Sequence, residues 1–127
     1  MNGEPIRDPS SLSSSLIARY AHQRQERLGA IYLDSRNRVL REREIYVGTL
    51  TSANVSTRDV FRFALEEGAA SIVVFHNHPS GDPSPSAEDL LFTKTLVQAG
   101  SVMNVAVLDH LIVALNGFVS MRERGMM

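Results

Sequence analysis

Hydrophobic and polar positions follow two different periods along this chain. Apolar residues spaced three and four apart predict helices, whereas alternating or continuous runs of apolar and β-branched residues predict strands. The expected helices cover residues 11–23, 57–68 and a segment that begins at Ser86. The expected strands cover residues 28–34, 39–47, 70–75, 102–108 and 111–115, with a last short one at 118–119.

Polar residues and glycine mark the ends of these elements. Residues 35–37 are typical of a turn, so the strands on either side of them should form a hairpin. Thr57 can cap a helix, and Gly68 can end it. Asp109 and His110 interrupt an apolar stretch. They are therefore expected to form a tight connection between two strands.

The predicted helices have apolar faces that need a partner. In the helix at 57–68 this face comprises Val60, Phe61, Ala64 and Leu65. In the last helix one stripe comprises Ala87, Leu90, Leu91 and Val97, and another comprises Phe92 and Leu96. Residues 70–75 are an uninterrupted apolar run, which is typical of a fully buried central strand. A central mixed β-sheet flanked by helices, an α/β (α+β) fold, would bury all these surfaces.

The length and composition narrow the class of protein. The chain has 127 residues, 43% of them hydrophobic, which suits one domain at residues 10–127 after a flexible tail at 1–9. Residues 48–56 are expected to be a loop. With 13 basic and 14 acidic residues the net charge is −1, which gives no sign of a nucleic-acid partner. The absence of cysteine excludes disulfides and thiolate metal ligands.

Neither a membrane span nor a secretory signal is evident in the sequence. No window approaches the roughly 18 consecutive apolar residues that cross a bilayer. Residues 1–25 lack the apolar centre of a signal peptide. A cytoplasmic location and no membrane partner are therefore expected.

The side chains that could bind a metal ion follow the predicted buried strand. Alternate side chains of a strand share a face, so His76 and His78 can direct two imidazoles to one point while Asn77 faces away. Asp89 follows in the first turn of the next helix, three residues after its expected cap Ser86. The loop between them contains three prolines and Gly81, which can reverse the chain.

Two imidazoles and one carboxylate can form three corners of a tetrahedral zinc site. Three protein ligands with one position open for water are typical of catalytic zinc, whereas structural sites are usually closed by four. Because only one of these ligands is anionic, the site would remain positive and would acidify the water. The sequence thus predicts one Zn²⁺ per chain, bound by His76, His78 and Asp89.

The spacing of these residues resembles a known motif. His-x-His, seven residues, Ser, two residues and Asp is the pattern of the JAMM metalloproteases, which have the JAB/MPN fold, a cytidine deaminase-like architecture. The longer run at 76–86, with Leu108-Asp109-His110 downstream, resembles the bacterial RadC branch, and the likeness covers nearly the whole chain after about Ser10. The resemblance implies hydrolysis of a peptide or isopeptide bond in an unidentified substrate.

The resemblance also assigns roles that spacing alone does not. Glu26 would be the general base and then the general acid, because it precedes a strand that ends in Leu-Asp, where RadC relatives carry a glutamate. Glu42 and Glu44 are the fallback residues for that role. Ser86 would donate a hydrogen bond to the oxyanion, although the Ser86-x-x-Asp89 spacing is also that of a helix capping box.

Other interpretations remain for the site and for the chain. His110 is either a hydrogen-bonded structural histidine or a residue near the metal or substrate. The domain as a whole could be a non-catalytic JAB-fold module that binds a partner, in DNA repair or recombination or elsewhere. A metal-dependent nuclease is disfavoured by the near-zero net charge. RadC proteins usually carry a helix-hairpin-helix segment ahead of this domain, for which 127 residues leave no room.

Overall fold

The computed structural model describes residues 3–50 and 57–127. In chain order the elements are a 3-10 turn η1 (Pro9–Leu12), α1 (Ser13–Tyr20), β1 (Arg27–Leu33), β2 (Val39–Val47), α2 (Thr57–Glu67), β3 (Ser71–Asn77), α3 (Ala87–Met103), β4 (Ala106–Ala114) and β5 (Gly117–Ser120). The predicted loop at 48–56 falls mostly outside the described residues. None of the helices in the described part of the chain could cross a membrane.

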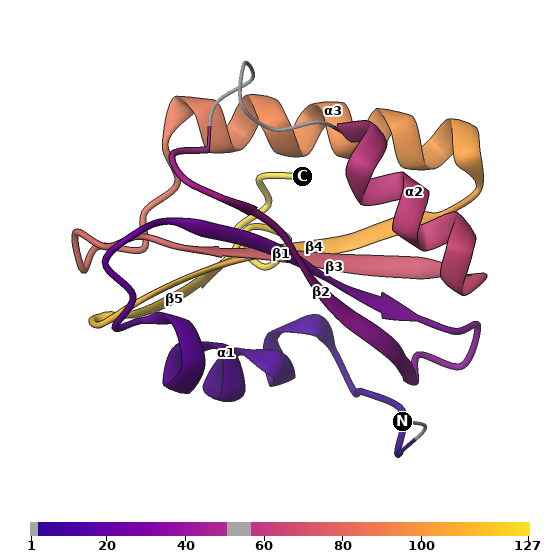
Figure 1. Cartoon of the computed structure of the whole chain (residues 1–127), viewed down its shortest axis with the longest axis horizontal. Coiled ribbons are helices and arrows are strands. Elements are labelled where there is room, and N and C mark those ends of the chain that lie inside the picture. Colours follow the sequence, from indigo (N-terminus) through magenta and orange to yellow (C-terminus); the bar gives the residue numbers. More distant parts are fainter. Residues whose placement is uncertain (1–2, 51–56) are drawn as a thin grey trace.

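The five strands form one mixed sheet, as the sequence predicted. Their order is β2-β1-β3-β4-β5. β3 and β4 are parallel and are joined by α3, whereas the other neighbours are antiparallel. β1 and β2 form the predicted hairpin. Figure 1 shows α2 and α3 on one face of the sheet and α1 on the other, so the central strands are buried on both sides.

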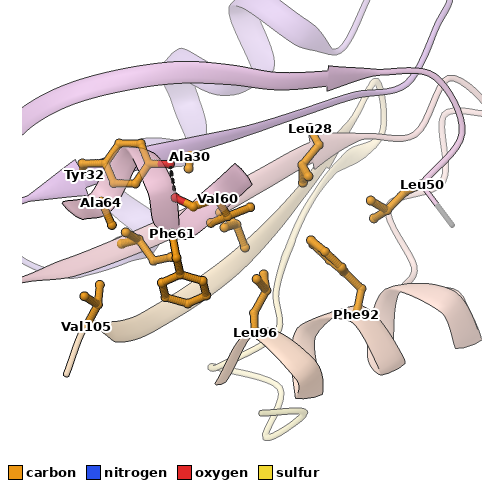
Figure 2. Close-up of a cluster of buried hydrophobic side chains, with 12 residues drawn as sticks. Leu28, Ala30, Tyr32, Leu50, Val60, Phe61, Ala64, Phe92, Leu96 and Val105 are labelled. Carbon is orange, nitrogen blue, oxygen red and sulfur yellow. Dashed lines mark hydrogen bonds between the residues drawn. The ribbon is translucent and has the colours of Figure 1, made fainter. Parts of the chain in front are cut away.

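Alternation along the central strand sends side chains into two hydrophobic clusters. On β3, Ile72 and Val74 join a cluster beneath α2 and α3. Figure 2 shows that β1, α2 and α3 all contribute side chains to this cluster. Val73 and Phe75 join the cluster beneath α1. Every residue of β3 is buried, which confirms the prediction of a fully buried central strand. This alternation matters for function, because His76 lies on the same face of β3 as Ile72 and Val74, the face that α3 covers.

The first α-helix is shorter than the predicted one at 11–23, because α1 begins at Ser13 after the 3-10 turn and ends at Tyr20. Asp8 caps the 3-10 turn by accepting from the Ser11 amide, Pro9 is buried, and α1 ends at Tyr20 rather than Gln23. Ile6 packs against the cluster beneath α1, and its amide donates to the Asn37 carbonyl at 2.9 Å. Part of the predicted tail therefore contacts the sheet, and a domain boundary at residue 9 stays a prediction.

The predicted apolar faces of the two later helices were partly wrong. On α2, Val60, Phe61 and Ala64 are buried, but Leu65 is 58% exposed. On α3 the buried face comprises Asp89, Phe92, Thr93, Leu96 and Gly100, whereas Leu90, Leu91 and Val97 are exposed. Of the two apolar stripes on α3, the one that contains Phe92 and Leu96 packs against the sheet together with Asp89.

The predicted turn at Asp109 and His110 was also wrong. α3 continues to Met103 and ends at Asn104 in the left-handed conformation (φ 58°), so the following strand starts four residues later than predicted. β4 then runs without interruption through both residues, which are buried inside it. The register against β3 shifts between Ile72 and Val73, where one extra β4 residue forms a bulge.

Candidate metal centre

His76 and His78 lie at the end of β3, on the face of the sheet that α3 covers. Their Nε2 atoms are 2.9 Å apart. The His76 side chain is fully buried, and that of His78 is 15% exposed. Asn77 lies between them on the opposite face, as predicted from the two-residue period of a strand. The two imidazoles therefore converge on one point at the rim of the sheet.

The chain reversal after His78 delivers Asp89 to that point. Gly81 adopts a positive φ of 93°, and its amide donates to the His78 carbonyl at 3.1 Å. Ser86 then caps α3, which places Asp89 in the first turn, 2% exposed. Oδ1 of Asp89 lies 3.1 Å from Nε2 of His76, and Oδ2 lies 3.1 Å from Nε2 of His78. The three predicted ligands thus come together from β3, its connecting loop and α3.

Hydrogen bonds at the far side of each ring determine which nitrogen faces the cluster. Nδ1 of His78 lies 2.9 Å from the carbonyl oxygen of Asp82. A carbonyl can only accept, so Nδ1 of His78 carries a proton, and Nε2 is bare whenever the ring is neutral. His76 has its Nδ1 2.7 Å from Nε2 of His110, a second buried histidine. One of these two nitrogens donates to the other.

The pKa values of His78 and Asp89 depend on each other, because the two side chains are in contact. Burial lowers the pKa of His78, but hydrogen bonds to the Asp89 carboxylate and the Asp82 carbonyl outweigh it, so the pKa lies above its ordinary value. Burial raises the pKa of Asp89, but hydrogen bonds from His76 and His78 outweigh it and bring the pKa well below its ordinary range. Asp89 is therefore an anion that favours a cation beside it.

This donor set fits a metal ion. If both rings are neutral with their protons on Nδ1, their Nε2 lone pairs repel at 2.9 Å, and an ionised carboxylate lies 3.1 Å from both. A positive charge at the point they share removes that repulsion. Imidazole and carboxylate are ligand types that zinc takes readily, so the cluster can hold such an ion.

Comparison with known proteins identifies the domain. Residues 6–126 match the model of a family described as RadC-like JAB domain. The chain belongs to this family. A UPF0758 protein of Chloroflexus aurantiacus is 45% identical over 122 residues, which cover 96% of this chain and 53% of the relative. A UPF0758 protein of Listeria welshimeri is 43% identical over 120 residues, which cover 94% of this chain and 54% of the relative.

Membership confirms the RadC resemblance and the JAB fold inferred from the motif. The chain spans about half the length of the relatives it matches.

A second carboxylate of the RadC-like JAB domain approaches the two histidines. A Glu26 carboxylate oxygen and one ring nitrogen each of His76 and His78 lie within 4.8 Å of one another, in a group that could hold a metal ion. The fallback residues have other partners, because Glu42 pairs with Arg19 and Glu44 with Arg27. Glu26 is thus the glutamate that the fold brings to the site.

The backbone around Glu26 is held by its neighbours. Oδ1 of Asn77 accepts from the Arg27 amide at 2.7 Å, and Nδ2 donates to the Gln25 carbonyl at 3.1 Å. The Glu26 carbonyl accepts from the Gly48 amide at 2.8 Å. Asn77, between the two histidines in the chain, therefore fixes the backbone on both sides of the glutamate.

Ser86 forms the capping box that was the alternative interpretation of its spacing. Its Oγ accepts from the Asp89 amide at 3.0 Å, and Oδ2 of Asp89 accepts from the Ser86 amide at 2.8 Å. Because the serine oxygen acts as an acceptor in the cap, its own proton remains available for a further bond. The cap and a role in catalysis are therefore compatible for this exposed residue.

Two buried residues behind the cluster had little or no place in the sequence analysis. His110 was placed in a turn, and Thr93 was not singled out. Both have fully buried side chains, and Nδ1 of His110 lies 2.6 Å from Oγ1 of Thr93. Burial lowers the pKa of His110 well below its ordinary value, so this ring is neutral. The available signal for Thr93 was its position four residues after Asp89, on the same face of a helix.

Proposed function

We propose that this domain is a zinc-dependent hydrolase of the JAMM type that cleaves a peptide or isopeptide bond. The observation that carries the proposal is the convergence of two imidazole Nε2 atoms and one carboxylate at the end of β3. Such a set of three protein ligands is typical of catalytic zinc. Membership of the RadC-like JAB family supports the same chemistry.

In this proposal His76, His78 and Asp89 hold one Zn²⁺. The ion, when bound, supplies a Lewis acid that makes water nucleophilic near neutral pH. The ligands come from one strand, its loop and the start of a helix, so the site exists only in the folded chain. The short connection through Gly81 and the cap at Ser86 keep the carboxylate facing the rings.

Glu26 serves as the general base and then as the general acid. Its carboxylate lies close enough to the histidines to accept a proton from the attacking water and to pass it to the leaving nitrogen. The bonds from Asn77 and Gly48 keep its backbone in place during both transfers. Ser86 donates its free hydroxyl proton to the oxyanion that develops on the substrate carbonyl.

Metal analysis of three matched proteins tests these roles. Wild type purified without chelators should contain about one zinc per chain and should cleave some member of a peptide and isopeptide panel. His78→Ala should lose the zinc. Glu26→Gln should keep the zinc and lose turnover by about 100-fold or more, because only proton transfer is removed.

Each variant can contradict a different part of the proposal. Retained zinc in His78→Ala would refute the ligand assignment. Loss of zinc in Glu26→Gln would make Glu26 a ligand instead of the base. Full metal content in wild type with no turnover on the panel would favour the alternative of a non-catalytic binding module.

A further inference from the structure

A chain of three hydrogen bonds lies behind the candidate metal site and connects two of its proposed ligands. Nδ1 of His76 is 2.7 Å from Nε2 of His110, and Nδ1 of His110 is 2.6 Å from Oγ1 of Thr93. Oγ1 of Thr93 then donates to the backbone carbonyl of Asp89 at 2.7 Å. Oδ1 of the same Asp89 lies 3.1 Å from Nε2 of His76, on the side of that ring where the metal would bind.

We propose that His110 and Thr93 are positioning residues that hold His76 in the tautomer whose Nε2 is free to bind metal. The inference rests on the proposed metal site and adds two residues to it. Neither residue would touch the ion or the substrate. Their effect would pass entirely through the ring of His76.

The direction of the three bonds that link Asp89, Thr93, His110 and His76 follows from the Asp89 backbone carbonyl, which can only accept. The Asp89 carbonyl takes the Thr93 hydroxyl proton, so Oγ1 of Thr93 is left to accept from His110. Nδ1 of His110 therefore carries a proton, and Nε2 of the neutral ring is an acceptor. That acceptor requires a proton on Nδ1 of His76. A neutral His76 with its proton on Nδ1 presents a bare Nε2 to the cluster.

The fold supports a functional use of this chain of hydrogen bonds. The three side chains come from β3, β4 and α3, and each is fully buried. The bulge in β4 is what allows His110 to face α3, because an extra residue shifts the alternation of the strand. An aliphatic side chain would suffice at position 110 or 93 if the residue only filled space. Burying His110 and Thr93 costs free energy unless their polar atoms are hydrogen-bonded.

Zinc affinity, measured by competition with a chromophoric chelator, tests the proposal directly. His110→Leu removes the acceptor and should weaken zinc binding by about 10- to 100-fold, the usual effect of losing a partner of a ligating histidine. His110→Gln can still accept from Nδ1 of His76 and should recover most of the affinity. Wild-type affinity in a folded His110→Leu protein would overturn the proposal.

Thr93→Val offers a second variant with a close control. It keeps the shape of the side chain and removes only the hydroxyl, so it should weaken zinc binding in the same direction. Thr95→Val is the control, because Thr95 lies on the same helix and donates to the Leu91 carbonyl at 3.1 Å but is exposed. Equal zinc affinities in the two valine variants would overturn the role of Thr93.

Nitrogen NMR of the histidine rings tests the tautomer without any metal. In metal-free wild type, Nδ1 of His76 should carry a proton, and this signal should be lost or weakened in Thr93→Val. A bare Nδ1 on His76 would overturn the inference. Because this measurement needs neither zinc nor substrate, its result is independent of whether the proposed hydrolase activity is found.

Discussion

Asp109 is a buried carboxylate that ties the C-terminal end of the chain to the sheet. Its Oδ1 accepts from the amides of His110 and Arg122 at 2.7 and 3.0 Å, and its Oδ2 accepts from the Ser120 hydroxyl at 2.5 Å. Burial raises the pKa of Asp109, the three hydrogen bonds partly offset that effect, and the charge of Glu123 adds to it. Three donors therefore hold the Asp109 side chain in place, but burial makes its charged form less favourable.

Asp109→Ala and Asp109→Asn should differ in stability. Alanine leaves three donors, two of them buried, without an acceptor and should lower the free energy of unfolding by about 1–3 kcal/mol. Asparagine keeps an oxygen for the two amides and should cost less. Urea denaturation at one pH measures both. A loss for asparagine as large as that for alanine would contradict this account.

The same residue should make wild-type stability depend on pH. Because the folded-state pKa of Asp109 is raised, the folded chain holds this proton more tightly than the unfolded chain. The stabilising contribution is complete below the unfolded pKa of about 3.9 and is lost as the pH rises through the raised folded value. The stability of wild type relative to Asp109→Asn should therefore fall over that range, and a constant difference would contradict the pKa shift.

At the scale of elements, the start of α3 serves both the fold and the site. The capping box of Ser86 and Asp89 satisfies backbone amides of the first helical turn. The Asp89 carboxylate also faces both histidines. One short stretch of helix therefore has to satisfy two requirements, and substitutions at Ser86 can separate them.

Ser86→Ala and Ser86→Gly should have different stabilities but similar activities. Alanine at a cap costs about 1 kcal/mol, whereas glycine costs only a few tenths. Both remove the hydroxyl that we propose as oxyanion donor, so both should lose about 10²–10³ in kcat. Thermal denaturation and peptide hydrolysis measure the two effects. Activity that follows stability would mean that Ser86 acts only as a cap.

The elements also show where pattern-based prediction fails. The spacing of residues in α3 correctly predicted a helix after Ser86, but the stripe with Leu90 and Leu91 proved to be exposed. Two stripes of similar hydrophobicity satisfy the same helical period, so local pattern cannot select between them. In β4 the polar pair at 109–110 was predicted to be a turn, but it lies in a continuous strand beside a bulge. The error arose because a bulge and a turn both interrupt the alternation of apolar residues.

At the scale of the whole molecule, the candidate metal site brings together segments that are far apart in the sequence. The proposed ligands come from the end of β3 and the start of α3, and Glu26 precedes β1. A bound ion would therefore favour the folded chain over the unfolded chain, in which these groups are separated.

Zinc should stabilise wild type and leave His78→Ala almost unchanged. At a zinc concentration about 100 times the Kd, the expected gain in unfolding free energy is about 2.7 kcal/mol. Differential scanning calorimetry with added zinc, and then with excess EDTA, measures the gain and its reversal. An equal rise of Tm in His78→Ala would show that zinc binds elsewhere.

The sequence by itself determined the features that depend on near neighbours. The periods of apolar residues predicted the helices, the hairpin and the buried central strand, and the spacing from His76 to Asp89 predicted which groups would meet. These inferences succeeded because strand alternation, helix caps and short loops are set by interactions within a few residues.

Only the tertiary structure decided the features that depend on contacts between distant segments. It selected the α3 stripe that faces the sheet, brought Glu26 beside histidines some fifty residues away, and used a one-residue bulge to turn His110 toward His76. The physical reason is that burial and register depend on the surface a segment meets, and the segment's own sequence does not contain that surface.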